Sequence, residues 1–227
     1  MPTLIGTLNE KPLHAALKEW YAEAGDRFEE RVGGYVVDIV RKNLLIEIQT
    51  GAFFPIRRKL DCLSKDHRVR LVYPIAEEKW IVKRAKGKRG KETRRKSPKR
   101  GAVEDVFHEL VTCPKLLKRR KFSLEVVLIQ EEEVRRYDGV RGWRKRGWVT
   151  EERRLLDIVE RRLFKTPRAM ASLIPADLPE PFRTADLAEA TDRPLWLAQQ
   201  MAYCLREMKA IIPVGKQANW ILYQRSD

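Results

Sequence analysis

The sequence predicts an α/β protein in which a mixed sheet flanked by helices is followed by a mostly helical domain. Up to about residue 136, short runs rich in β-branched residues alternate with stretches of helical periodicity, which is typical of a sheet covered by helices. Residues 137–149 are basic and rich in glycine, and the periodicity beyond them is mainly helical. We therefore expect a first domain over residues 1–136, a linker over 137–149 and a second domain over 150–227.

The composition indicates a basic protein with an anionic partner. The formal net charge is +15 and charged residues make up 35% of the chain, which favours a nucleic acid or another anionic polymer or surface. No run of 18 apolar residues and no signal-peptide pattern occurs, so we expect a cytoplasmic protein with no membrane partner. Cys62, Cys113 and Cys204 are far apart, so we expect reduced thiols rather than disulfides or a zinc site. No small-molecule cofactor is expected.

The elements of the first domain follow from periodicity in chain order. Apolar residues at helical spacing predict a first helix that begins near Glu10. β-Branched runs predict two strands joined by Lys42 and Asn43 as a two-residue turn, in which Asn tolerates a positive φ. A helix beginning near Pro55 and further strands complete a sheet with mixed strand directions. The expected ranges are helix 10–21, polar connection 25–34, strands 36–40 and 44–50, helix 55–63, strands 67–75 and 79–83, helix 102–112 and strand 122–130.

Two carboxylates and an amide lie inside the apolar runs of the predicted hairpin. The turn sets a register that pairs Arg41 with Leu44 and Asp38 with Glu47, and Gln49 lies on the same face as Glu47. Opposed carboxylates repel each other, and their burial is costly unless a cation compensates. Mg²⁺ prefers hard oxygen ligands and often takes only one or two carboxylates, so a divalent metal site is one interpretation. The other is a one-sided hairpin in which Asp38 and Glu47 face solvent.

Charged residues on the two neighbouring helices have two interpretations each. Glu10 is either a first-turn acid that complements the helix dipole or a third acid aimed at the metal site. Arg57, Arg58 and Lys59 form either a solvated helix face or a contact to phosphate near the reaction site.

Residues 83–100 form a basic arm. They contain eleven Lys or Arg residues against one acid, Glu92, and carry two thirds of the net charge. Because the arm has no aliphatic residue larger than alanine beyond position 83, it is expected to be a flexible loop or a protruding ribbon. It would either solubilise the protein or bind phosphates without sequence preference. Residues 137–147, with four basic residues and Trp143, are a second candidate DNA contact. The expected nucleic-acid contacts in the arm are Lys88, Arg89, Lys91, Arg94, Arg95 and Lys96.

The second domain has the element order of a winged helix-turn-helix, with two short helices, a turn and a hairpin. The helix over 194–208 would be the recognition helix, with Arg193 and Arg206 as DNA contacts. It is less basic than most recognition helices, so a protein-interaction or dimerising winged helix is the alternative. The expected elements are helix 151–164, a helix capped by Thr166 with Pro167 after it, a helix with Thr184 as N-cap, helix 194–208 and hairpin 211–223.

The residues around the hairpin resemble those of the PD-(D/E)XK nuclease superfamily, and look closest to its small Holliday-junction-resolvase-like and Mrr-like members. Glu10 on a first helix, Asp38 on a strand and Glu47-Ile48-Gln49 on the next strand, with a basic helix after them, match the motif order over roughly residues 5–82. The resemblance implies a restriction-endonuclease-like fold. It also implies that Asp38, Glu47 and the backbone carbonyl of Ile48 bind Mg²⁺, with Mn²⁺ as a substitute. Gln49 stands where lysine is commoner and cannot supply the positive charge of lysine.

The sequence therefore predicts a Mg²⁺-dependent DNA endonuclease-like protein that hydrolyses phosphodiester bonds. Glu10, Asp38, Glu47 and Gln49 would form the catalytic site, with Gln49 orienting the attacking water. The basic arm and the winged helix would hold duplex or branched DNA, and a homodimer is an expectation that comes from related nucleases alone. The alternatives are a catalytically inactive DNA-binding or regulatory protein on the same fold, and an RNA-binding protein without enzyme activity.

Overall fold

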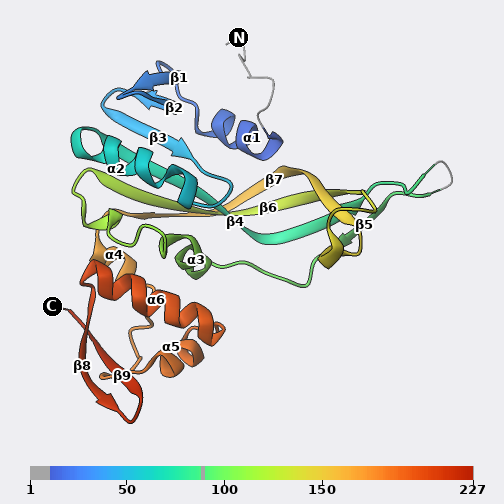
Figure 1. The fold of residues 1–227 in the computed structure, drawn as a ribbon. Coiled ribbons are helices and arrows are strands. Elements are labelled where there is room, and N and C mark those ends of the chain that lie inside the picture. Colours follow the sequence, from blue (N-terminus) through green and yellow to red (C-terminus); the bar gives the residue numbers. More distant parts are fainter. Residues whose placement is uncertain (1–10, 88–89, 227) are drawn as a thin grey trace. The chain divides into compact units, whose positions relative to one another are not determined.

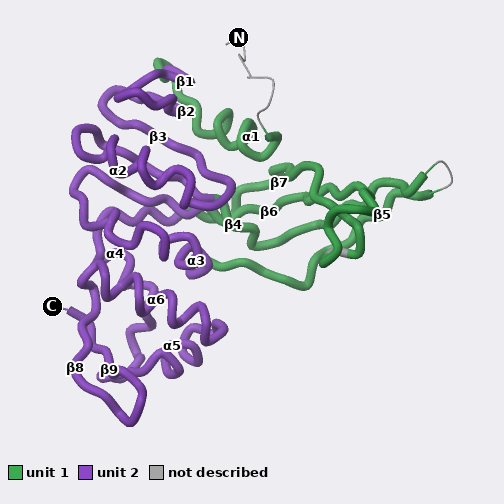
Figure 2. The backbone as a smooth tube through the Cα atoms, viewed as in Figure 1, with its two compact units in different colours: residues 1–26, 74–102, 127–161 green, residues 27–73, 103–126, 162–227 purple. Residues whose placement is uncertain are grey.

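The computed structural model describes residues 11–87 and 90–226. The chain divides into two compact units, each built from separate segments (Figure 2). Two long strands, β4 (Arg68–Lys83) and β6 (Phe122–Tyr137), contribute their first parts to unit 2 and their later parts to unit 1. Unit 1 takes the described residues of 1–26, 74–102 and 127–161, and unit 2 takes those of 27–73, 103–126 and 162–227.

The expectation of an α/β protein with a mixed sheet is confirmed (Figure 1). The hydrogen-bonded strand order is β1-β2-β3-β4-β6-β7, and β5 pairs with β4. β1 pairs antiparallel with β2 and β2 pairs antiparallel with β3, whereas β3 and β4 are parallel, so strand directions are mixed. The other strands of this sheet are β1 (Arg27–Val32), β2 (Tyr35–Arg41), β3 (Leu44–Ile48), β5 (Thr93–Lys96) and β7 (Trp148–Phe164).

The predicted hairpin is confirmed in its position and register. β2 and β3 pair with Arg41 opposite Leu44 and Ile39 opposite Ile46, as a two-residue turn requires. The positive φ of the turn, 51°, falls on Lys42 rather than on Asn43. A two-residue hairpin turn needs a positive φ at its first central residue, which is Lys42 here. The pairing of β2 with β3 on both sides of the turn keeps Lys42 in this unfavourable conformation.

The polar connection predicted over 25–34 is wrong, because it contains strand β1. Its residues are half-buried or exposed, so the apolar alternation that reveals a strand is weak. β1 instead forms through pairing with β2, in which Arg27 lies opposite Val40 and Val32 opposite Tyr35. Residues 27–32 adopt the strand conformation because they pair with the apolar strand β2. The residue pattern of this segment alone does not contain that information.

A helix connects the parallel strands β3 and β4 in unit 2, as predicted. It begins with a short 3₁₀ turn, η1 (Phe54–Ile56), and continues as α2 (Arg57–Asp66). Leu60 and Leu63 are buried on one side of α2, which is the side that the apolar spacing predicted. Figure 1 shows α2 running alongside β3 and β4.

The two strands predicted over 67–75 and 79–83 are one strand, β4. The prediction broke the strand between Ile75 and Lys79, at Ala76 and the polar residues Glu77 and Glu78. In the structure the polar stretch stays paired, since Gly101 N donates to Ala76 O at 2.9 Å. The acids are balanced by basic partners on the arm, so polarity does not end the strand.

Unit 1 joins the helix α1 (Pro12–Tyr21) with the later parts of β4 and β6, with β5 and with most of β7. β5 pairs antiparallel with β4, with Trp80 opposite Lys96, so the arm is in part a ribbon. The helix predicted over 151–164 is wrong, because these residues belong to β7. Its apolar residues are spaced as in a helix, but Arg153 and Thr150 bond to acids of β6, and this pairing favours the strand.

The C-terminal elements of unit 2 follow the predicted order. The helix capped by Thr166 is confirmed, since its side chain accepts a hydrogen bond from Ala169 N at 3.1 Å. The cap of the next helix is Arg183 rather than Thr184, because Asp186 at N3 accepts from Arg183 N at 2.7 Å. The bounds are η2 (Val103–Val106), α3 (Phe107–Leu110), η3 (Leu116–Lys118), α4 (Pro167–Ala171), α5 (Thr184–Ala190), α6 (Leu195–Met208), β8 (Ile211–Gln217) and β9 (Trp220–Arg225).

Within the described ranges, no helix has the length and apolar character needed to cross a membrane.

Candidate functional site

The predicted carboxylates lie on neighbouring strands of unit 2. Asp38 is on β2 and Glu47 is on β3, and both belong to the confirmed hairpin. The Oδ2 atom of Asp38 accepts a hydrogen bond from Ile48 N at 2.7 Å. The structure therefore brings Asp38, Glu47 and Ile48 together, as the sequence predicted, whereas Glu10 lies outside the described residues.

Glu47 is the buried acid of this site. Its side chain is 8% exposed, and Oε1 forms a short ion pair with Nζ of Lys59 from α2. Its other oxygen, Oε2, is buried and has no hydrogen-bond partner among the described residues. Burial and, next, the charge of Asp38 raise the pKa of Glu47 while Lys59 lowers it, and the result is a pKa of about 7.

Lys59 has a role that the sequence interpretation missed. We expected it to contact phosphate, but in the structure its Nζ is bonded to Glu47 inside the site. The signal was its place on the same side of α2 as Leu60 and Leu63, where a lysine has no packing reason to be. A lysine on a buried helix face normally needs an acidic partner.

Gln49 follows β3 and is fixed by the loop that leads to α2. Its Nε2 donates to Ala52 O at 2.6 Å, and its backbone N donates to Val72 O at 2.9 Å. The side chain is thus fixed to the loop directly after β3, two residues beyond Glu47.

The donor set fits a hard divalent cation. In the part of the chain that the structure describes, no cluster of three or more His, Cys, Asp or Glu side chains occurs. Two carboxylates and a backbone carbonyl suit Mg²⁺, which keeps water and phosphate oxygens for its other positions. The unbonded Oε2 of Glu47 is the atom that a cation would satisfy.

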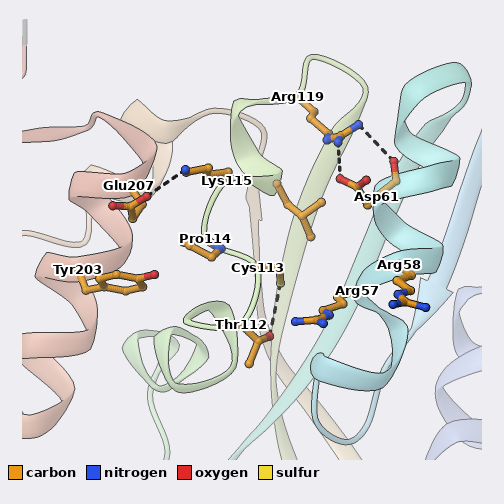
Figure 3. A pocket seen from close by; sticks show the side chains of 11 residues that line it. Arg57, Arg58, Asp61, Thr112, Cys113, Pro114, Lys115, Arg119, Tyr203 and Glu207 are labelled. Atoms are coloured by element: carbon orange, nitrogen blue, oxygen red, sulfur yellow. Dashed lines mark hydrogen bonds and ion pairs between the residues drawn. The ribbon is translucent and has the colours of Figure 1, made fainter.

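A groove of about 640 Å³ lies beside α2 in unit 2 (Figure 3). It is lined by α2, by the loop around residues 112–119 and by α6. Arg119 pairs with Asp61, and Lys115 pairs with Glu207 at 3.3 Å. Arg57 and Arg58 have no ion-pair partner among the described residues, and Figure 3 shows Arg57 pointing toward the loop. The groove therefore offers two cations to an anion.

The groove is also lined by the thiol of Cys113. Burial raises the pKa of Cys113 to about 11, so the thiol stays protonated at neutral pH.

The predicted arm contacts are partly neutralised inside unit 1. Arg94 Nε lies 2.6 Å from Glu132, and Lys96 Nζ lies 2.7 Å from Glu78. Lys91 and Arg95 are exposed. Lys88 and Arg89 lie outside the described residues. The acids that pair with the arm, Glu78 on β4 and Glu132 on β6, lie outside residues 83–100, so the charge of these residues alone overstates the positive charge that the arm leaves free.

The predicted recognition helix, α6, has part of its surface occupied within unit 2. His108 of α3 is hydrogen-bonded to Gln200 at 3.3 Å and contacts the ring of Trp196. Arg193 donates to Thr191 O at 3.3 Å, and Arg206 lies over the ring of Tyr203. Both arginines are half-buried, so the basic surface that α6 offers to DNA is small.

The raised pKa of Glu47 predicts how the stability of the metal-free protein varies with pH. The folded state binds this proton more tightly than the unfolded state, so the free energy of unfolding should fall as pH rises from 4.5 to about 7. The loss is about 3 kcal/mol. Urea denaturation in EDTA across this range should show it, and Glu47→Gln, which cannot titrate, should remove that part of the slope. An identical slope in both proteins would contradict it.

Comparisons with known proteins identify a family without an assigned activity. Residues 11–165 match the family model described as a domain of unknown function, DUF8091. An uncharacterized protein of Treponema pallidum (strain Nichols) is 30% identical over 187 residues, which cover 82% of this chain and 74% of that protein. No solved structure matches the chain. Because the family model covers more than half of the sequence, the chain belongs to the DUF8091 family.

Proposed function

We propose that the protein is a Mg²⁺-dependent DNA endonuclease-like protein that hydrolyses phosphodiester bonds. The observation that carries the proposal is Glu47, a buried carboxylate with one unbonded oxygen, next to Asp38 on the paired strand and to Lys59. Such an arrangement is costly for folding and is typical of a functional site.

The order of elements around the site supports a restriction-endonuclease-like fold. The two antiparallel strands β2 and β3 carry the acids, and α2 and the parallel strand β4 follow them. In the C-terminal part, α5, α6 and the hairpin β8–β9 have the order of a winged helix, and Phe182 bridges to Tyr223 of β9 just before α5. This short pairing next to the hairpin is what a winged helix-turn-helix would require.

Mg²⁺ would be held by Asp38, Glu47 and the backbone carbonyl of Ile48, where it would activate water and neutralise charge on the phosphate. Lys59 supplies the positive charge that Gln49 lacks, and it reaches the site from α2 instead of from β3. The loop fixes the amide of Gln49 through Ala52, so its oxygen can accept a hydrogen bond from the attacking water.

The cations at the start of α2 would bind the phosphates that flank the cleaved bond. Arg57 and Arg58 lie two residues and one residue before Lys59 and have no acidic partner among the described residues. Guanidinium groups bind phosphate with paired, charge-assisted hydrogen bonds. Exposed arm residues such as Lys91 and Arg95 would add affinity that falls with salt.

Metal-dependent cleavage is the experiment that tests this function. Purified protein is expected to nick or cut at least one of plasmid, branched, single-stranded or linear duplex DNA in Mg²⁺ or Mn²⁺, and to be inactive in EDTA. Gel analysis over a time course measures it. DNA that is bound but never cut under these conditions would instead support the catalytically inactive DNA-binding alternative.

A further inference from the structure

The loop between β6 and β7, residues 138–147, exposes a large aromatic side chain that the proposed function does not use. Trp143 is 79% exposed and Val140 is 90% exposed, the highest values among the exposed large apolar side chains of the described residues. Exposure of this much apolar surface on one loop is unfavourable in water and is common where a protein contacts a partner.

The loop holds Trp143 in place instead of leaving it mobile. A short 3₁₀ turn, η4 (Trp143–Lys145), lies between two left-handed residues, Gly142 and Arg146. A side chain at Gly142 would come within 2.5 Å of Trp148 O, so only glycine fits there. Hydrogen bonds close the loop between Asp138 N and Gly147 O at 2.9 Å, Gly147 N and Gly142 O at 3.0 Å, Arg146 N and Trp143 O at 3.0 Å, and Arg141 N and Asp138 Oδ1 at 2.8 Å.

The loop is also strongly basic. Residues 136–146 contain five Lys or Arg residues and one acid, Asp138. This acid is already engaged, since it pairs with Arg136 at 3.3 Å and accepts from Arg141 N. Arg144 and Arg146, on the C-terminal side of Trp143, are exposed and form no ion pair with any described residue, so they are available to an anion.

Cation–aromatic pairs connect the loop to the basic arm within unit 1. Lys86 lies 3.7 Å from the ring centroid of Tyr137, and Lys83 lies 4.7 Å from that of Trp148. The rings of Tyr137 and Trp148 meet edge to face at 5.6 Å. Aromatic rings and cations thus alternate from the arm into the loop, which is the pattern of surfaces that bind nucleic acid strands.

This pattern favours nucleic acid over lipid. A loop that enters a membrane presents a continuous apolar face, whereas Arg141 and Arg144 flank Val140 and Trp143. Arg144 lies 5.2 Å from the centroid of the Trp143 ring, so a cation accompanies the ring itself. A nucleotide offers the flat face of its base to the ring and its phosphate to the cation at the same time.

We propose that Trp143 is a stacking platform for an unpaired nucleobase, and that the basic residues of the loop hold the phosphates beside it. The substrate class is nucleic acid that contains unpaired or unstacked bases, at a branch or in a single strand. The inference deepens the proposed function and rests on it only for the identity of the polymer as DNA.

Binding in EDTA tests the inference without any cleavage. Fluorescence anisotropy with labelled single-stranded, branched and fully paired DNA should show that Trp143→Ala weakens binding to the first two about tenfold. Binding to paired duplex should stay within about twofold, since phosphate contacts remain. Trp143→Phe should retain most of the affinity because it keeps a ring. Trp20→Ala, which removes another exposed tryptophan outside the proposed DNA-binding elements, is the matched control and should bind like the wild type.

The outcomes separate this inference from the nuclease proposal. Trp143-dependent binding of unpaired DNA by a protein that never cuts would support the platform and contradict the nuclease. The same dependence with single-stranded RNA in place of DNA would support the platform and change the polymer. An equal loss on paired duplex, no loss on any substrate, or Trp143-dependent binding to phosphatidylserine vesicles without binding to nucleic acid would overturn it.

Discussion

Asp38→Asn and Glu47→Gln are each expected to reduce metal-dependent DNA cleavage by about 1,000-fold or more. Each change would remove an anionic ligand from the proposed two-carboxylate metal site, and a bound metal typically supplies several kcal/mol of transition-state stabilisation. Both replacements keep the shape of the side chain, although Glu47→Gln also leaves Lys59 without its anion. Initial cleavage rates in Mg²⁺ and Mn²⁺ measure the effect.

DNA binding separates loss of catalysis from loss of folding. Removing a negative charge should leave affinity for DNA unchanged or raise it, because the polymer is anionic. Glu189→Gln, an exposed acid on α5, is the matched control and should cleave at the wild-type rate. Wild-type cleavage rates in Asp38→Asn or Glu47→Gln would show that the carboxylates do not bind the catalytic metal.

The hairpin was predictable from sequence because all its information is local. A two-residue turn fixes the register, so the pairing of Ile39 with Ile46 follows from Lys42 and Asn43 alone. The proximity of Asp38 and Glu47 follows in turn. Helix α2 was predictable for the same reason, since its apolar spacing is contained in ten residues.

The errors occurred where distant segments decide the conformation. β1 and β7 carry too many charged residues to resemble strands on their own, and each becomes one by pairing with an apolar neighbour or with buried acids. β4 continues past Glu77 and Glu78 because Arg100 and Lys96 balance them from the arm. Periodicity within a window cannot register such partners.

In the candidate site, too, the features set by local sequence were predicted and those set by distant segments were not. Its carboxylates were found because they interrupt local apolar runs, whereas the bond between Lys59 and Glu47 exists only once α2 folds back beside β3. The groove of unit 2 depends on three segments around residues 57–61, 112–119 and 203–207. The sequence of one segment does not indicate that the other two lie beside it. The groove was therefore found only in the folded structure.

Glu131 is expected to be the acid whose replacement destabilises the protein most. It lies on β6 with its side chain fully buried, and its oxygens pair with Lys79 at 2.9 Å and with Arg153 at 2.6 Å. Neighbouring Glu133 shares Lys79, at 3.2 Å. Burial alone would raise the pKa of Glu133, but hydrogen bonds from Arg135 and Thr150 and the charge of Lys79 hold it well below its usual value.

Glu131→Gln should lower the free energy of unfolding by about 3–5 kcal/mol, because two partly buried cations lose their shared anion while remaining in place. Urea denaturation at neutral pH measures the change. Glu77→Gln is the matched control, because Glu77 pairs with Arg100 in an exposed bridge worth about 1 kcal/mol or less. If Glu131→Gln and Glu77→Gln lowered the free energy of unfolding equally, solvent would screen the network of Glu131 as strongly as it screens the exposed pair of Glu77 and Arg100. A large difference would identify the network of Glu131, Lys79 and Arg153 as the interaction that holds β6 and β7 together in unit 1, and so as the reason that residues 151–164 form a strand.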